Sequence, residues 1–127
     1  MKKIYVSEGE VLDKISILEI KSQNINDNNK IKNIKKELEI LKAETIDLLL
    51  DKKVFELYLE LKEVNLKLWN IEDRIRIKER NKKFDDEFVE LARSVYYTND
   101  ERSSIKKKIN ILLCSEIIEE KSYEDYK

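Results

Sequence analysis

The sequence predicts an all-α protein, arranged as an up-down antiparallel bundle of four to five helices with a short extended N-terminal arm. Two observations support this fold class. The 127 residues include one glycine and no proline, whereas average usage would give roughly nine and six, so the turn chemistry of all-β folds is missing. Apolar residues also recur at helical spacing along most of the chain. We expect a single domain over residues 1–127, with 119–127 as a charged tail.

The first two helices follow the extended arm at residues 2–6. Ser7 and Glu10 have the spacing of a capping box, which predicts that the first helix begins here. The asparagine-rich run 26–29 predicts the turn that ends it. Apolar residues at helical spacing then predict a second helix over residues 30–50.

Two helices carry more apolar surface than one core face requires. Ile17 and Ile20 point away from the main stripe of the first helix, so a monomeric bundle would leave them in solvent. The third helix, expected from the Asp51 cap to about residue 81, has a second apolar row roughly 120° from its core stripe. This row contains Phe55, Leu59, Leu66 and Ile77. We therefore predict a symmetric homodimer.

The last helical region begins at a cap on Asp85. Thr98 and Glu101 form a second possible capping box, so the chain either breaks at residues 97–99 and restarts or continues as one helix. The apolar spacing continues to about Ile118. Two tyrosines beyond it would let the charged tail dock on the bundle.

Composition excludes several function classes. The chain has no histidine and one cysteine, Cys114, which we interpret as a small core residue. Zinc sites of imidazole or thiolate, serine-histidine triads and disulfide frameworks are therefore excluded. With 26 basic and 27 acidic residues the net charge is -1, so we expect no nucleic-acid partner. No apolar run is long enough for a signal peptide or a membrane span, which favours a cytoplasmic protein without a membrane partner.

We expect no metal and no cofactor. Glu60 with Glu63, and Glu87 with Glu90, have the ExxE spacing by which some helical enzymes hold magnesium. Both pairs lie off the apolar core stripes, and such spacings arise readily by chance in a glutamate-rich chain. They do not predict a metal site.

Arginine is distributed unevenly. Lysine outnumbers arginine 21 to 5, yet all five arginines fall between residues 74 and 102. Arginine offers a planar fork for carboxylate or phosphate that lysine lacks. The apolar stripe of the third helix also becomes polar after Leu68. In an up-down bundle this segment lies level with polar residues of the first and last helices. The predicted ligand-binding residues of this polar layer are Lys21, Glu72, Arg76, Arg93, Tyr96, Asn99 and Arg102.

Three functions fit such a layer. The first is an inter-helical pocket for a small anionic ligand that bears phosphate or carboxylate. The second is a structural or protein-interaction bundle, whose layer is a self-satisfied network that fixes helix register, such as Glu72 with Arg76 or Arg102. The third is a small all-α enzyme in which arginine and glutamate stabilise an anionic transition state, with no catalytic residue assigned.

Arg102 distinguishes the first two functions. If Arg102 only pairs internally, Arg102→Ala leaves a buried carboxylate unpaired and costs roughly 3 to 5 kcal/mol. If it serves a ligand pocket, the substitution costs little, and phosphate or sulfate raises the melting temperature of the wild type.

Three segments resemble a known family. They are VSEGEVLDKISILEIK at 6–21, ELARSVYYTNDERSSIKKKIN at 90–110 and EEKSY at 119–123. Together they resemble a family of small bacterial and phage helical proteins, known as a domain of unknown function. The resemblance covers nearly the whole chain and implies that polar positions belong to the family pattern, without implying an activity. The signature residues in this sequence are Ser7, Gly9, Glu10, Asp13, Lys14, Glu19, Lys21, Trp69, Glu72, Asp73, Arg76, Arg93, Asn99, Asp100 and Arg102.

Overall fold

The computed structural model of residues 1–127 is all helical and contains no strand. Its elements are α1 (Glu8–Asn24), α2 (Asn28–Thr45), the short 3-10 helix η1 (Leu48–Leu50), α3 (Lys52–Arg80) and α4 (Asp86–Leu112). The all-α prediction is confirmed. Four helices are present and a fifth is not.

Each of the four helices starts at a side-chain cap. The cap is Ser or Asp in every case, and its side-chain oxygen accepts a hydrogen bond from the backbone N–H three residues later. The four cap residues are Ser7, Asp27, Asp51 and Asp85. Three of these starts were predicted. The capping box at Ser7 is only half formed, because the Glu10 carboxylate turns to Lys106 of α4 instead.

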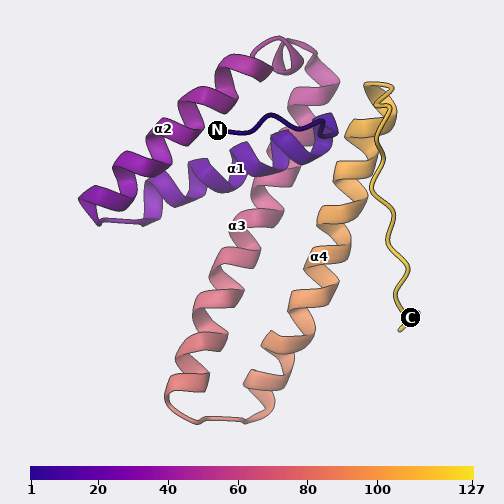
Figure 1. Cartoon of the computed structure of the whole chain (residues 1–127). Coiled ribbons are helices and arrows are strands. Elements are labelled where there is room, and N and C mark those ends of the chain that lie inside the picture. The colour runs from indigo at the N-terminus through magenta and orange to yellow at the C-terminus, as the bar shows by residue number, and fades with distance from the viewer.

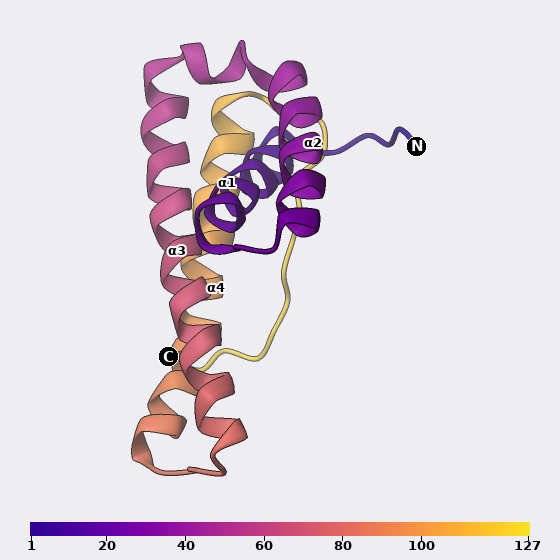
Figure 2. The same cartoon turned by 90° about the vertical axis from the view of Figure 1, so that its left-hand side faces the viewer.

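The helices pack as two crossed hairpins. α3 and α4 run antiparallel side by side, and α1 lies across the upper part of this pair with α2 beside it (Figures 1 and 2). The predicted up-down arrangement is therefore not confirmed. The two hairpins also differ in length: α3 and α4 have 29 and 27 residues, whereas α1 and α2 have 17 and 18. At 1.5 Å per residue, the long pair extends about 40 Å and the short pair only about 25 Å.

The core lies where α1 crosses the long hairpin. Leu12 and Ile15 of α1 pack there with apolar residues of α3 and with Ile109 of α4. The prediction that Ile17 and Ile20 face solvent is wrong: Ile20 is only 2% exposed, and Ile17 is half-buried. α1 lies between α2 and the α3–α4 hairpin, so it is covered on more than one side.

α4 continues through residues 97–99 without a break. Thr98 is buried inside the helix and does not cap one. Neither glycine nor proline is present to interrupt this segment.

The helix ends at Leu112, earlier than the predicted residue 118. Cys114 has a left-handed φ of 52°, and the N–H of Ser115 donates to the carbonyl of Asn110, which is the Schellman pattern. Cys114 is exposed, so its assignment to the core is wrong. The left-handed residue at this helix end is a cysteine. The glycine that usually marks such an end in a sequence is therefore missing.

The C-terminal tail turns back in the direction of α4 (Figure 1) and meets this helix near both ends of the tail, at Glu119 and Glu120 and at Tyr126, while its middle bows outward (Figure 2). Tyr126 packs against Tyr96 and Tyr97, with ring centroids 5.0 Å apart in both pairs. Its hydroxyl donates to the carboxylate of Asp100. This contact fixes the far end of the tail on the long hairpin.

Alkaline titration is expected to report this docking. The hydrogen bond to Asp100 raises the pKa of Tyr126 from its ordinary 10.0 to about 12. Because the docked tail holds this proton more tightly than a free tail, docking is fully stable below pH 10 and weakens as the pH rises toward 12. Near-ultraviolet absorbance should therefore show one tyrosine ionising about two pH units late. Asp100→Ala should return it to its ordinary range. An unchanged titration curve in Asp100→Ala would show that the contact is not formed.

Candidate functional site

A buried polar network lies where α1 meets α3 and α4. The Asp13 side chain is 2% exposed and accepts two hydrogen bonds from Arg102, one from Nε at 2.9 Å and one from Nη2. Asn65 Nδ2 donates to Asp13 Oδ1 at 2.9 Å and to Ser16 Oγ at 2.7 Å. The Ser16 hydroxyl donates to the backbone carbonyl of Asp13. Helices α1, α3 and α4 are therefore joined through one carboxylate.

This geometry keeps Arg102 charged. Its hydrogen bond to Asp13 raises the pKa of Arg102 above its usual range and outweighs the opposing effect of burial. A two-point contact between guanidinium and carboxylate also fixes the plane of the fork. Arg102 therefore presents its remaining N–H groups, the two of Nη1 and the second one of Nη2, in a set direction.

A groove of about 420 Å³ opens beside this network. Its apolar lining comes from α1 and α3, and its polar lining comes from α3 and α4. The lining residues are Ile17, Ile20, Asn65, Leu68, Trp69, Glu72, Asp73, Arg76, Asn99 and Arg102. We refer to it as the α1–α3–α4 groove.

The groove brings together four of the seven predicted ligand-binding residues. They are Glu72, Arg76, Asn99 and Arg102. The other three lie elsewhere. Lys21 is in the last turn of α1 and its side chain takes part in no hydrogen bond or ion pair. Arg93 pairs with Glu90 at 2.9 Å, and Tyr96 stacks on Tyr97 and contacts the tail.

Helix geometry explains the separation of Arg93 from Arg102. The two residues are nine positions apart on the continuous helix α4, which places them on opposite sides of it. The side chain of Arg93 lies over the Tyr97 ring, with its guanidinium carbon 6.0 Å from the centroid. The arginines therefore do not converge on one site.

The register-fixing network differs from the one expected. Arg76 does pair with Glu72, but at 3.4 Å and with its side chain 78% exposed, so this pair contributes little to stability. Arg102 pairs with Asp13 and not with Glu72. The strong internal partner of Arg102 thus comes from α1, and Arg76 is left largely in solvent at the edge of the groove.

Sequence reasoning did not assign Asp13 or Ser16 to the site. They lie on a second buried face of α1, opposite its apolar stripe. The buried residues of this face are Gly9, Leu12, Asp13, Ser16 and Ile20. Because three of the five are small or polar, hydropathy periodicity does not detect the face. The available signal is the single glycine, placed in the first turn of a helix.

Glu19 belongs to a separate polar cluster. Tyr58 donates its hydroxyl to Glu19 Oε1, and Lys62 Nζ lies 3.2 Å from Glu19 Oε2. These contacts join α1 to α3 away from the groove. The polar layer predicted at one height is therefore two clusters, because α1 crosses α3 and does not run alongside it.

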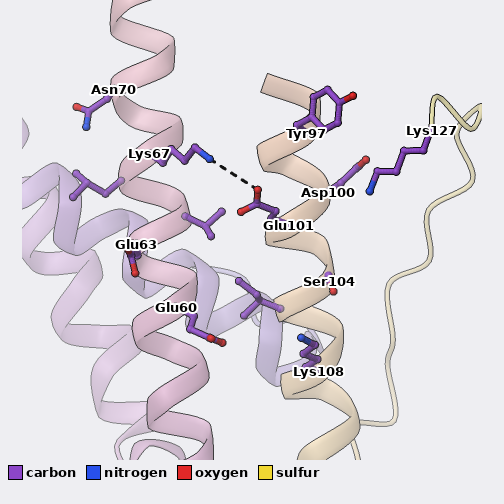
Figure 3. A pocket seen from close by; sticks show the side chains of 13 residues that line it. Glu60, Glu63, Lys67, Asn70, Tyr97, Asp100, Glu101, Ser104, Lys108 and Lys127 are labelled. Atoms are coloured by element: carbon purple, nitrogen blue, oxygen red, sulfur yellow. Dashed lines mark ion pairs between the residues drawn. The ribbon is translucent and has the colours of Figure 1, made fainter. Parts of the chain in front are cut away.

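A larger groove of about 930 Å³ lies between α3 and α4 (Figure 3). Lys67 faces Glu101 across it at 3.9 Å, and its remaining charged residues include Glu60 and Glu63. None of the seven predicted residues lines it. Four acidic residues and three lysines line this groove, and no buried partner fixes them. It is therefore a weaker candidate for a specific site.

No group of three or more acidic or sulfur ligands is placed to hold a metal ion. None of the helices combines the length and apolar composition that a membrane span requires.

Comparison with known proteins identifies a family. The family described as "Family of unknown function (DUF6165)" matches residues 1–126. This confirms the resemblance to a family of unknown function. No curated protein and no solved structure matches the chain.

Proposed function

Since the chain belongs to DUF6165, a family of unknown function, we propose its function from the site itself: it is a binding module for a small anionic ligand in the α1–α3–α4 groove. The observation that carries the proposal is a prearranged arginine. Arg102 is held by the buried Asp13, which in turn accepts a hydrogen bond from Asn65, and it lines a groove to which α1 contributes the apolar residues Ile17 and Ile20. Ligand sites are typically apolar cavities of this size with a few fixed polar groups.

Three polar side chains would contact the anionic group. Arg102 offers the Nη1 hydrogens that Asp13 does not use. Arg76 is available to a ligand, because its only ion pair is the weak, exposed contact with Glu72. Asn99 makes no side-chain hydrogen bond within the chain and can serve as donor or acceptor. A phosphate or carboxylate between the two guanidinium groups would accept charge-assisted hydrogen bonds from both.

The rest of the lining suggests what else the ligand carries. Trp69 and Leu68 supply an apolar surface beside the arginines. Glu72 and Asp73 would repel a ligand of high negative charge. The groove therefore favours a ligand with one anionic group and an apolar or hydrogen-bond-donating body.

Thermal melts with inorganic phosphate test the proposal. We expect phosphate to raise the melting temperature of the wild type with the logarithm of its concentration, reaching about 2.7 kcal/mol of stabilisation at a hundred times the dissociation constant. Arg76→Ala should lose most of this response and remain folded, because its side chain is exposed.

Two controls separate binding from charge screening. Arg93→Ala removes the same charge on the far side of α4 and should keep the full response. Chloride at matched ionic strength should have no comparable effect. Equal responses in Arg76→Ala and Arg93→Ala, or no response in the wild type, would contradict the proposal.

The second candidate function is self-assembly through the outer face of α3. The apolar row of this helix is exposed, and each of its residues is 43% to 49% exposed. Its members are Phe55, Leu59, Leu66 and Ile77. A two-fold axis at Leu66 between antiparallel α3 helices would set Phe55 against the partner's Ile77, since both are eleven residues from Leu66. One patch would thus cover itself, as a symmetric dimer requires.

We expect a dimer in sedimentation at micromolar concentration, and Leu59→Lys with Leu66→Lys should convert it to a monomer. Charged side chains in the centre of an apolar contact cannot be desolvated without a large cost. Ile40→Lys with Ile46→Lys introduces the same charges at exposed positions outside α3 and should leave the dimer intact. If the wild type is a monomer, self-assembly is contradicted. The proposal of an anionic ligand in the α1–α3–α4 groove does not depend on this result.

A further inference from the structure

The C-terminal tail lies on a surface of α4 that matches it in charge. Lys106 Nζ is 2.7 Å from Glu10 Oε2 and 3.1 Å from Glu119 Oε2. Lys107 Nζ is 3.1 Å from both carboxylate oxygens of Glu120. Two consecutive acidic residues of the tail therefore meet two consecutive lysines of α4.

The cationic end of this surface is partly enclosed. A cavity of about 230 Å³ there is lined by Glu10, Arg102, Ser103, Lys106, Glu119 and Lys121. The Lys106 side chain is 12% exposed. Burial lowers the pKa of Lys106, but the hydrogen bonds to Glu10 and Glu119, together with the negative charges of Asp13 and Glu10, outweigh it, and the pKa is raised overall. Glu119 therefore supplies a carboxylate to a positively charged, half-enclosed position.

Aromatic contacts hold the other end of the tail. The Tyr126 ring meets both Tyr96 and Tyr97 edge-on, and its hydroxyl donates to Asp100. Tyr96 and Tyr97 would expose more of their rings if the tail left. We refer to the α4 residues under the tail as the tail face: Tyr96, Tyr97, Asp100, Lys106 and Lys107.

The tail is attached by contacts that are individually weak. Residues 116–127 form no helix or strand and make no backbone hydrogen bond to the body of the protein. The Lys107–Glu120 pair is exposed and contributes at most about 1 kcal/mol, and an aromatic pair contributes about the same. In the Lys106–Glu119 pair the lysine is largely buried, but the tail carboxylate is 47% exposed. The tail competes with any separate segment of similar chemistry for this surface of α4. Because the tail is covalently attached, its effective concentration at the surface is on the order of millimolar.

We propose that the tail face is a recognition surface for an acidic segment of a partner protein, with two adjacent glutamates followed six residues later by a tyrosine. The chain's own residues 119–127 occupy this surface until such a segment replaces them. The spacing of the contacting tail residues defines the class of segment that would bind. Glu119 and Glu120 pair with the two lysines, and Tyr126 makes the aromatic contact.

The test uses a full-length variant with a released tail and a labelled synthetic peptide of residues 115–127. Glu119→Gln, Glu120→Gln and Tyr126→Ala together remove the ion pairs and the aromatic contacts of the tail, and all three positions lie outside the helices. In fluorescence anisotropy the peptide should bind this variant at least about tenfold more tightly than the wild type, where the tail competes. Binding should weaken as salt is added.

Matched charge reversals locate the bound peptide. In the released variant, Lys107→Glu should weaken peptide binding at least about fivefold. Lys108→Glu should not, because the tail carboxylates of Glu119 and Glu120 pair with Lys106 and Lys107 and not with Lys108. A peptide with Tyr126 replaced by alanine should also bind weakly. The proposal fails if the released variant does not bind the peptide, or if Lys107→Glu and Lys108→Glu weaken it equally.

Discussion

Replacing Arg102 by alanine is expected to lower the free energy of unfolding by about 3 to 5 kcal/mol. The substitution removes both hydrogen bonds from the guanidinium to Asp13, whose side chain is 2% exposed. Asn65 would still donate to Asp13, but an amide cannot neutralise the carboxylate. Urea unfolding of the wild type and of the variant measures the difference.

Arg93→Ala provides the matched control for this substitution. It removes an arginine from the same helix whose pair with Glu90 is exposed, so the expected loss is below about 1 kcal/mol. A loss in Arg102→Ala as small as in Arg93→Ala would show that Asp13 does not depend on Arg102.

The Arg102 experiment also bears on the function of the groove. The observed pair with Asp13 shows that Arg102 connects α4 to α1, although the structural interpretation expected Glu72 as its partner. A ligand role is compatible with this, because only Nε and Nη2 of the guanidinium contact Asp13. A large loss in Arg102→Ala, combined with no phosphate effect on the wild type, would reject the pocket and leave a purely structural network.

Helix starts were predictable from sequence because they depend on local chemistry. Ser7, Asp51 and Asp85 each satisfy a backbone N–H three residues ahead, whatever the helix packs against. The end of α4 was not predictable in the same way. Its left-handed residue is Cys114, a residue type that rarely adopts this conformation.

The crossing of α1 could not be derived from apolar periodicity. Its second buried face includes Gly9, Asp13 and Ser16, which do not differ in hydropathy from a solvated face. Because this face was not recognised, Ile20 was assigned to solvent and Asp13 was left out of the site. The prediction still found Arg102, Arg76, Asn99 and Glu72, since these polar residues interrupt stripes that are otherwise apolar.

Gly9 explains how α1 approaches α4 so closely. A Cβ at this position would lie 2.6 Å from the backbone carbonyl oxygen of Lys106 and 2.8 Å from Oδ1 of Asn110. The backbone N–H of Gly9 also donates to that Asn110 oxygen at 2.7 Å. Its φ is not positive, so the glycine is required by contact and not by conformation.

Gly9→Ala is therefore expected to destabilise the protein by about 2 to 4 kcal/mol, although alanine is the better helix former by about 1 kcal/mol. The nearest atom belongs to the backbone of α4 and cannot rotate away, so α1 and α4 must separate and strain the buried hydrogen bond. Gln23→Ala, at an exposed position of α1, should change stability by less than about 0.5 kcal/mol. Urea unfolding measures both.

Adding Asn110→Ala should recover little of the Gly9→Ala loss, because the Lys106 carbonyl stays in place. A Gly9→Ala protein more stable than the wild type would show that α1 and α4 lie farther apart than this contact requires.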